Sequence, residues 1–369
     1  MADFTEDVTL SFDGQVLRGF QQVNVARSMK KAEITFGVKA TNPAWSADAF
    51  LVRFARNIEI KAGGDLMVMG QVDDYESEQT GGSESREVRI SGTSKGALSA
   101  RHPPVKHKTG RVENKTLLDV AKEFDETGVG FTAEDGLNLR KIPMVQRHPL
   151  DTTFATIERY ARAEGVMLAG QPDGGVKLTR GSDKRHPDLI EGESRIKKLK
   201  VKISQKNKTS PNVVRGQRRV GTQGKETRQE EQVFDPSVGA FRPTIIFGET
   251  DQDKREQKDR GEWQRLRQGA FGGVSISMTV AGWRDADGTI WEPGRLIFCR
   301  VASEKVEQDM RLESVTYTQD EKGTVAELTL VDPATTGKAN KGGKAAAAKN
   351  KSHPGYGIAA PAWTLDNGI

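Results

Sequence analysis

The sequence is poor in cysteine, with Cys299 as the only one among 369 residues. A single thiol cannot form an intrachain disulfide, so nothing points to an oxidising, secreted environment. A structural zinc site is also disfavoured, because such sites need clustered cysteines and histidines and the five histidines here are dispersed. The sequence therefore predicts no metal site and no cofactor.

Long apolar runs are absent as well. No run approaches the roughly 18 residues that a membrane-spanning helix needs. Residues 1–7 are acidic, whereas a signal peptide begins with basic residues that are followed by an apolar segment. We expect a soluble chain made in the cytoplasm, with no membrane insertion. Hydrophobic residues make up 35% and charged residues 29%, which favours two or three domains with small cores over one large core.

The charge is not strongly of one sign, since 56 basic and 51 acidic residues leave a net charge of +5. This balance indicates only a mild preference for acidic partners. The basic stretch 197–219 could form a nucleic-acid groove, but single-strand binders interleave aromatic residues to stack bases and this stretch has none. We interpret it as a solvated or subunit-facing strand and expect no specific nucleic-acid partner.

What the chain does contain is β pattern, clearest from Gly272 to Pro333. Apolar and polar residues alternate from Val274 to Val280, the period of a half-buried strand. Further strands are predicted at 296–301, 310–318 and 325–331, with a turn at Asp287-Gly288. Their short spacing indicates an antiparallel meander within a small barrel or sandwich.

Residues 8–95 form a first β region. Val8 to Phe12, the turn Asp13-Gly14 and the strand from Val16 to Arg18 predict a hairpin. Further strands are predicted at 23–28, 32–38, 58–61, 66–72 and 88–91, with a short helix around 43–56 and a polar loop at 76–85.

The two β regions share a sequence pattern. Residues 70–75, a polar turn containing glycine and then 88–90 are echoed by residues 312–317, a similar turn and then 328–330. This match suggests a duplicated β module.

The middle of the chain predicts a small α+β domain over 105–190. Thr116 with Asp119 resembles a capping box at the start of a helix, and a second helix starts near Asp151-Thr152 and ends at Gly165. A hairpin follows around 171–175. The expected apolar residues of the two helices are Leu117, Leu118, Val120, Ala121 and Phe124, and then Phe154, Ile157 and Tyr160 or Ala161.

The remaining segments are less regular. Strands at 199–203 and 212–216 could return to complete the first barrel, 218–232 is expected to be a mobile loop, and 251–268 a polar helix anchored by Trp263 and Leu266. The expected organisation is a first barrel at 1–100 (completed by 195–217), the α+β domain at 105–190, a loop and helix connection at 218–270, the main part of a second barrel at 271–335, and a flexible basic linker with a tail at 336–369.

Histidines offer no catalytic constellation. His102, His148 and His186 each lie in an Arg-His-Pro tripeptide, where the proline favours extended loop backbone. We interpret all three as structural or exposed loop residues, because a catalytic histidine would need a paired nucleophile or carboxylate.

Carboxylates and glycines are equally uninformative about catalysis. Asp73 and Asp74 are adjacent on a strand and point to opposite faces, while Asp285 and Asp287 lie at a turn, where aspartate is favoured for backbone reasons. Gly272-Gly273 precedes a strand, whereas a phosphate-binding loop precedes a helix. No catalytic, cofactor-binding or metal-binding residue is predicted, and we expect no enzymatic activity.

The order of several short segments along the chain carries further information. These segments are Val8 to Leu10, Gly19-Phe20, Val23 to Ser28, Gly70 to Asp73, Asn114 to Leu117, Glu164 to Met167, Phe241 to Ile246, Gly282-Trp283 and Asp287 to Pro293. In this order they resemble the Mu-like baseplate hub family, also called tail protein P and grouped with the phage late-control D proteins. The resemblance spans about residues 8–335.

The resemblance implies a mainly β fold with two similar small antiparallel barrels and an α+β insert, assembled as a homotrimeric ring of pseudo-six-fold symmetry. It implies a structural hub in the baseplate of a contractile phage tail, related to type VI secretion spikes, that joins the six-fold tail tube to the three-fold central spike. The implied partners are further copies of the chain, the spike, the tube and the wedge proteins, in a virion assembled in the host cytoplasm. Strands of neighbouring barrels would pair or abut around such a ring.

Two other functions stay open. A tail-associated cell-wall hydrolase, with 105–190 as a glycan-binding module, would need a coherent acidic pair or a Cys/His or metal cluster, which the sequence does not offer. A nucleic-acid binder would be retained on DNA in a strongly salt-dependent way.

Overall fold

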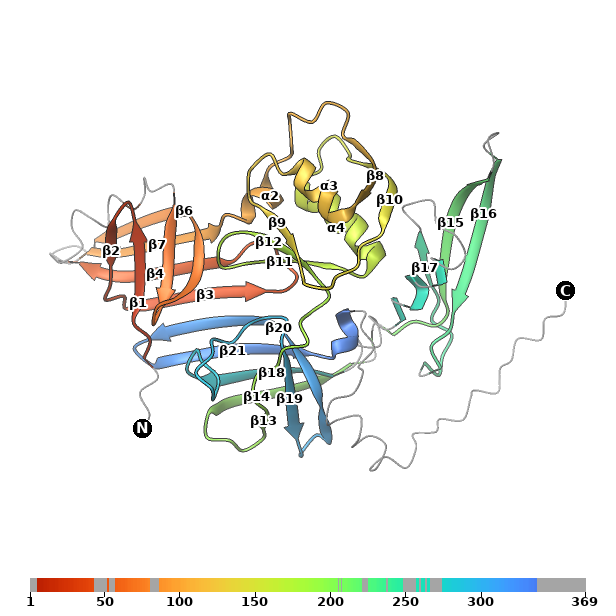
Figure 1. Ribbon diagram of the computed structural model, residues 1–369. Coiled ribbons are helices and arrows are strands. Elements are labelled where there is room, and N and C mark those ends of the chain that lie inside the picture. Colours follow the sequence, from red (N-terminus) through yellow and green to blue (C-terminus); the bar gives the residue numbers. More distant parts are fainter. Residues whose placement is uncertain are drawn as a thin grey trace. The chain divides into compact units, whose positions relative to one another are not determined.

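The computed structural model describes residues 5–42, 52, 57–79, 86–204, 206, 208–220, 225–236, 238–247, 257–258, 260–262, 264–265 and 274–336. The chain divides into two compact units. The first comprises residues 1–200, 276–297 and 311–330, and the second comprises 201–275, 298–310 and 331–369. The fold is mainly β, with its helices concentrated in one insert (Figure 1).

The first β module holds seven strands, drawn in red and orange in Figure 1. Their order in the sheet is β3-β4-β7-β6-β5-β1-β2. Asp13 and Gly14 both have positive φ, as a type I′ turn requires, which confirms the expected first hairpin. The strands are β1 (Val8–Phe12), β2 (Gln15–Leu17), β3 (Gln22–Ser28), β4 (Thr35–Asn42), β5 (Ile58–Ala62), β6 (Asp65–Gln79) and β7 (Arg86–Ser94).

The second β module contains the four strands expected in the 272–333 stretch and two strands from earlier in the chain. Its strands are β13 (Leu189–Ile190), β14 (Ile196–Ile203), β18 (Val274–Ala281), β19 (Leu296–Val301), β20 (Val306–Asp320) and β21 (Gly323–Val331). A short 3-10 helix, η2 (Pro333–Thr336), follows β21.

Two expectations about pairing in the second module are wrong. β18 pairs with β21 rather than with β19, because the chain between β18 and β19 is a long connection that buries Trp283 and Trp291 instead of a tight hairpin. β14 pairs with β18, so residues 196–203 extend the second module and do not complete the first.

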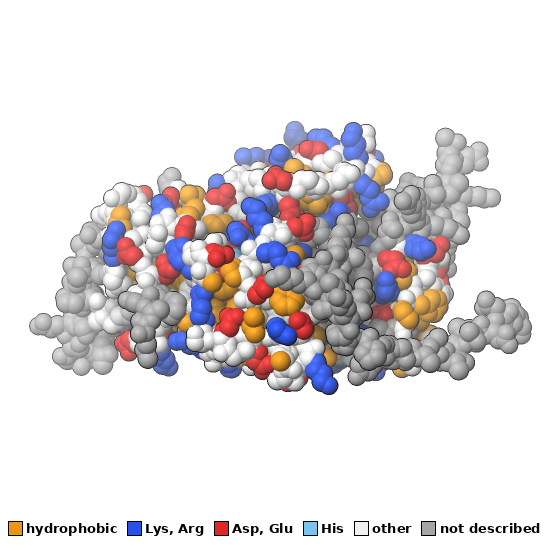
Figure 2. Space-filling view, turned by 60° about the horizontal axis from the view of Figure 1, so that its bottom comes forward, with side chains coloured by type: hydrophobic (Ala, Val, Ile, Leu, Met, Phe, Trp, Pro, Cys, Tyr) orange, Lys and Arg blue, Asp and Glu red, His pale blue; other side chains and the backbone are white. Residues whose placement is uncertain are grey.

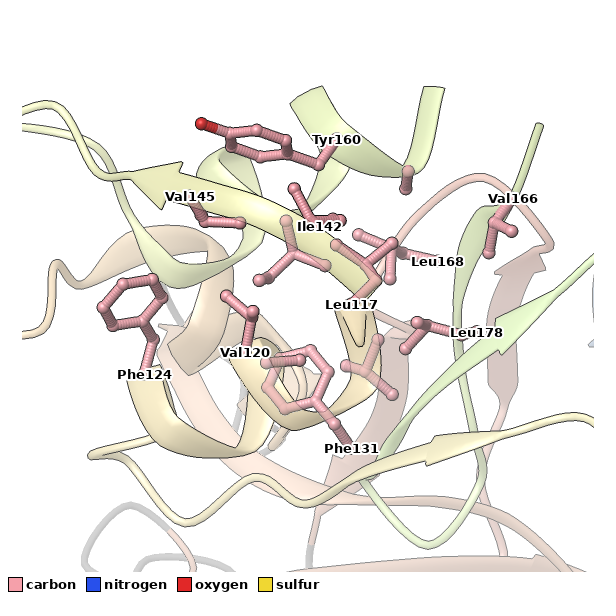
Figure 3. Packing of buried hydrophobic residues seen from close by; sticks show 14 of the residues in the cluster. Leu117, Val120, Phe124, Phe131, Ile142, Val145, Tyr160, Val166, Leu168 and Leu178 are labelled. Atoms are coloured by element: carbon pink, nitrogen blue, oxygen red, sulfur yellow. The ribbon is translucent and has the colours of Figure 1, made fainter. Parts of the chain in front are cut away.

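The α+β insert confirms the helices expected from capping signals. α3 (Leu117–Phe124) starts at the capping box of Thr116 and Asp119, and α4 (Thr153–Glu164) ends at Gly165 in the left-handed conformation. Their apolar faces meet in one buried cluster that includes Ile157. Leu117, Phe124 and Tyr160 of the same cluster are labelled in Figure 3. The other elements are α2 (Ala97–Arg101), β8 (Arg111–Thr116), β9 (Phe131–Ala133), β10 (Lys141–Gln146), β11 (Met167–Gly170) and β12 (Val176–Thr179).

The insert is joined closely to the first module through the turn between β3 and β4. The backbone N–H of Gly170 donates to the carbonyl of Lys31 at 2.8 Å, and a Cβ at Gly170 would lie 2.3 Å from the carbonyl oxygen of Ala32. Only glycine permits this approach, so the β11–β12 hairpin packs directly on the β3–β4 turn.

The second unit contains a separate three-stranded sheet. β15 (Asn212–Val220) pairs antiparallel with β16 (Lys225–Val233) and parallel with β17 (Thr244–Phe247). The expected mobile loop at 218–232 is therefore wrong over most of its length. β16 has almost no apolar residue, and cross-strand pairs such as Arg215 with Glu230 at 2.8 Å support a strand that hydrophobic periodicity cannot reveal.

Some expectations fall outside the described residues. The described positions of the 251–268 segment are helical, but its anchors Trp263 and Leu266 lie outside them. Also outside the described residues are the expected 43–56 helix apart from Val52, residues 80–85 of the polar loop, and residues 337–369 of the linker and tail. Within the described part of the chain, no helix has the length and apolarity to cross a membrane.

Candidate assembly surfaces

The strand order reveals an internal duplication. The first module runs β3-β4-β7-β6-β5-β1, and the second runs β14-β18-β21-β20-β19-β13. In each, a 15-residue strand (β6 or β20) is followed by a 9-residue strand (β7 or β21). The duplicated β module inferred from the sequence is therefore present in the pairing of the strands.

The two modules do not form separate closed barrels among the described residues. Both belong to one 13-stranded sheet, because β20 of the second module pairs antiparallel with β3 of the first. We call this β20–β3 pairing the seam. It runs from Ser314 opposite Ser28 to Gln319 opposite Val23.

The seam buries apolar side chains on one face and satisfies polar groups at its end. Val315 and Tyr317 from β20 and Val23 and Val25 from β3 are all at most 1% exposed. Just beyond the paired residues, the Nζ atom of Lys30 lies 2.7 Å from a carboxylate oxygen of Glu313. The seam is thus an extensive backbone and side-chain interface between two copies of the same architecture within one chain.

Tyr317 anchors the buried face of the seam. Its hydroxyl donates to the carbonyl of Trp291, and its ring lies 5.5 Å from the ring of Trp283. Burial raises the pKa of Tyr317 to about 12, because the phenolate would be desolvated. The buried phenol therefore keeps its proton near neutral pH and anchors the packing of the seam.

A second connection between the modules is made by Arg284. Its guanidinium contacts Glu6 at 2.8 Å and Asp65 at 2.7 Å, and Nη2 donates to the carbonyl of Ala62 at 3.0 Å. Hydrogen bonding to Glu6, followed by that to Asp65, raises the pKa of Arg284 against the opposing effect of burial. The connection from β18 to β19 is thereby fixed to the N-terminal segment and to the β5–β6 turn.

His186 is buried and fully engaged in structure. The backbone N–H of Glu292 donates to Nε2 at 3.0 Å, so the ring proton is assigned to Nδ1, which lies 2.7 Å from a carboxylate oxygen of Asp285. Burial lowers the pKa of His186, more than hydrogen bonding to Asp285 raises it. Asp285 also accepts from the backbone N–H groups of Asp287 and Thr289. This His–Asp pair holds a turn and has no nucleophile at its other nitrogen.

Arg311 is a buried cation that ties the second module to the connection leaving the α+β insert. It is 2% exposed, and its Nη1 donates to the carbonyls of Ser182 at 2.7 Å and Gly294 at 2.6 Å. Gly181 lies beneath the guanidinium, where a Cβ would come within 2.4 Å of Nη1. Burial lowers the pKa of Arg311. Neither this role nor that of Arg284 is evident from sequence, since nothing in their local patterns marks them.

The other residues considered for chemistry are dispersed. His102 and His148 are exposed, and Asp73 accepts from Thr93 at 2.8 Å and from Arg101 at 3.0 Å, while Asp74 is exposed on the strand. Among the residues that the structure describes, no group of three or more His, Cys, Asp or Glu side chains could hold a metal ion.

Comparisons with known proteins show which proteins this chain resembles. Residues 253–337 match the family model described as "Mu phage baseplate assembly protein GpP, fourth domain". The chain is 22% identical over 300 residues to the baseplate hub protein gp44 of Escherichia phage Mu, covering 79% of this chain and 78% of that protein. The resemblance to Mu-like baseplate hub proteins is confirmed. With it, the expectation of a β-rich protein of a phage tail baseplate is confirmed as well.

Solved structures share the fold over nearly the whole length of this baseplate hub relative. The 43 kDa tail protein of prophage MuSo2 from Shewanella oneidensis superposes with a TM-score of 0.77 at 21% identity, covering 90% of this chain and 99% of that one. The tail protein from Neisseria meningitidis MC58 gives 0.74 at 17% identity, covering 89% and 96%. At these identities the likeness shows the fold alone.

Proposed function

We propose that this baseplate hub relative is a structural hub that assembles as a homotrimeric ring and joins the six-fold tail tube to the three-fold central spike. Its partners in this role are further copies of itself, the spike protein, the tube protein and the wedge proteins of the baseplate. The role is mechanical: the ring holds the spike, aligns the tube and transmits sheath contraction.

The single observation that carries this proposal is the duplicated strand order within one chain. Two copies of one module, joined at the seam, give each chain two near-equivalent surfaces. A closed ring of three such chains presents six similar modules in alternation, so one face can match a six-fold partner while the chain itself repeats three times. Rings of this kind need heterologous contacts, in which different surfaces of neighbouring copies meet.

The surface chemistry supports polar contacts within such an assembly. Figure 2 shows acidic and basic side chains interspersed with hydrophobic ones over the visible face of the molecule. An obligate ring buries of the order of 2,000 Å² or more per interface, and the low hydrophobic content of 35% favours charged and hydrogen-bonded contacts over much of that area. We propose no enzymatic activity, since both ring nitrogens of the buried His186 are engaged in hydrogen bonds, one with Asp285 and one with the backbone N–H of Glu292.

The test is the solution mass together with partner binding. Multi-angle light scattering on the purified chain should give three times 40.5 kDa, at low and at high salt. The trimer should then co-elute with the spike and tube proteins encoded by the same phage. A chain that stays monomeric with and without its spike would contradict the ring, and clearing of a peptidoglycan gel would contradict a purely structural role.

A further inference from the structure

Half of β6 carries an edge that no described strand covers. β5 pairs with β6 only from Asp65 to Gly70, and β7 occupies the opposite side of β6. From Val72 to Glu78 no described strand pairs with β6 on the side facing away from β7. An unpaired strand edge of this length is a template for pairing with another chain.

The duplication shows what belongs on this edge. In the second module, Leu312 forms backbone hydrogen bonds with Gly294 and Arg295, next to β19, and from Ser314 onward the same side of β20 pairs with β3. Gly70 therefore corresponds to Leu312, and the bare half of β6 corresponds to the half of β20 that forms the seam. β20 is buried or half-buried there, whereas β6 is mostly exposed.

The module counterpart of β3 is β14, because each begins its module's strand order. β3 alternates between buried and half-buried residues, as expected of a strand paired on both sides. Among the described strands, β14 pairs with β18 alone; it has no fully buried residue, and Ile203 at its end is 59% exposed. The second module thus offers a β3-like strand whose outer edge is uncovered among the described residues.

The two bare edges carry opposite charges on matching faces. Asp74, Glu76 and Glu78 are exposed and share one face of β6, since their β7 partners include Arg89, while the β7 partners of Tyr75 and Ser77 are the buried Ile90 and Val88. The positions Lys198, Lys200 and Lys202 likewise share one face of β14 and are exposed, and Leu199 and Val201 lie on the other. We call the two the acidic edge (Val72–Glu78) and the basic edge (Ile196–Ile203).

We propose that the acidic edge of one copy pairs antiparallel with the basic edge of a second copy, which repeats the seam between chains. The proposal rests on the proposed ring and names the surfaces that build it. Along the sheet of one chain, β14 and β6 are separated by β18, β21, β20, β3, β4 and β7, so each edge takes its partner from another copy.

Each copy offers each edge once, so the contact is head-to-tail and closes into a ring or continues as a filament. In the antiparallel pair the three lysines face the three carboxylates across the strands, where opposite charges stabilise pairing and like charges oppose it. The apolar residues of β14 cover Tyr75 on the other face, as Val25 of β3 covers Tyr317 in the seam.

The test reverses the charges on the full-length chain. The acidic-edge variant is Asp74→Lys/Glu76→Lys/Glu78→Lys, the basic-edge variant is Lys198→Glu/Lys200→Glu/Lys202→Glu, and a swap variant carries all six changes. The matched control is Lys106→Glu/Lys108→Glu/Lys141→Glu, which alters three exposed lysines of the insert. Sedimentation velocity measures self-association, and circular dichroism melting verifies that each variant is folded.

Each single-edge variant should weaken self-association about 100-fold or more, because three attractive pairs become repulsive. The swap variant should restore the trimer, and the control should leave it unchanged. Hydrogen exchange gives an independent readout: amides of 72–78 and 196–203 should be protected in the wild-type trimer and exchange rapidly in both single-edge variants.

The outcomes separate this inference from the ring itself. A folded single-edge variant that remains trimeric, or a folded swap variant that stays monomeric, overturns the edge pairing while leaving a trimeric hub intact. A wild-type chain that does not self-associate at any concentration, with or without its spike, overturns both. If the basic-edge variant loses only retention on DNA while its mass is unchanged, the lysines serve a nucleic acid and the inference fails.

Discussion

Replacing Arg284 with alanine tests whether the two modules of this baseplate hub relative are braced by a partly buried ion pair. The guanidinium makes two contacts with the carboxylate of Glu6, at 2.8 and 3.3 Å, and the side chains are 27% and 11% exposed. The contact with Asp65 is as short, at 2.7 Å, but Asp65 is 56% exposed. Distance alone ranks the two pairs as equal, whereas burial ranks Glu6 far above Asp65.

The expected magnitudes follow from this difference in exposure. A charge-assisted, two-pronged hydrogen bond away from water contributes about 1.5–3 kcal/mol, and an exposed ion pair about 0.2–1 kcal/mol. With the lost hydrogen bonds to the carbonyls of Ala62 and Gly288, Arg284→Ala should lower the free energy of unfolding by roughly 3–4 kcal/mol.

The assay is a pair of double-mutant cycles in urea at pH 7, followed by tryptophan fluorescence and by circular dichroism. The Arg284/Glu6 coupling energy should be about 2 kcal/mol and the Arg284/Asp65 coupling about 0.5 kcal/mol. The control is Arg18→Ala, which removes a pair with Asp7 in which both side chains are about two-thirds exposed, and which should cost under about 0.5 kcal/mol. An Asp65 coupling equal to or larger than that of Glu6 would refute the reasoning from burial.

Three further predictions concern buried groups. Stability should fall as the pH drops from about 7 toward 5, because an unfolded histidine takes up a proton near its ordinary pKa of 6.5 while folded His186 stays neutral; His186→Gln should flatten this part of the unfolding profile, and an unchanged slope would count against it. Between pH 10 and about 12 the free energy of unfolding should fall by up to about 1.4 kcal/mol per pH unit, since Tyr317 keeps its proton when folded and loses it when unfolded. Tyr317→Phe should lack this fall, and a wild type and a variant with the same pH dependence would contradict the burial of Tyr317. Gly181→Ala should lower the free energy of unfolding by more than about 2 kcal/mol, because the added Cβ would collide with Arg311. Gly192→Ala is the control: Gly192 has a similar positive φ and no atom within 4 Å, so the loss there should be about 1 kcal/mol. Equal melting temperatures for the two variants would contradict the close contact.

Much of the local structure of this chain was determined by its sequence. The turn at Asp13-Gly14, the capping box at Thr116 and the left-handed Gly165 depend on a few neighbouring residues, so they could be located without a partner. Period-two alternation found β18 and β19 for the same reason. The echo of residues 70–75 in 312–317 located the duplication, and the collinear segments indicated the hub family.

Strand partners, in contrast, were decided by the tertiary structure. Alternation says that Val274–Ala281 is a strand but not whether it pairs with β19 or β21. β16 shows no apolar period, because its pairing with β15 depends on cross-strand charges. Sequence placed β14 with the wrong module, since a strand rich in lysine carries no information about which edge it joins.

The candidate surfaces divide in the same way. The sequence contained the lysines of 197–202 and the carboxylates of 73–78, and it suggested that the basic stretch could face another subunit. Only the sheet order showed that both strands end with a bare edge and that β20 and β3 already form the same junction within the chain. The contacts of Arg284 with Glu6 join residues 278 positions apart. Such contacts depend on how strands from distant segments are brought together, which local sequence patterns do not encode.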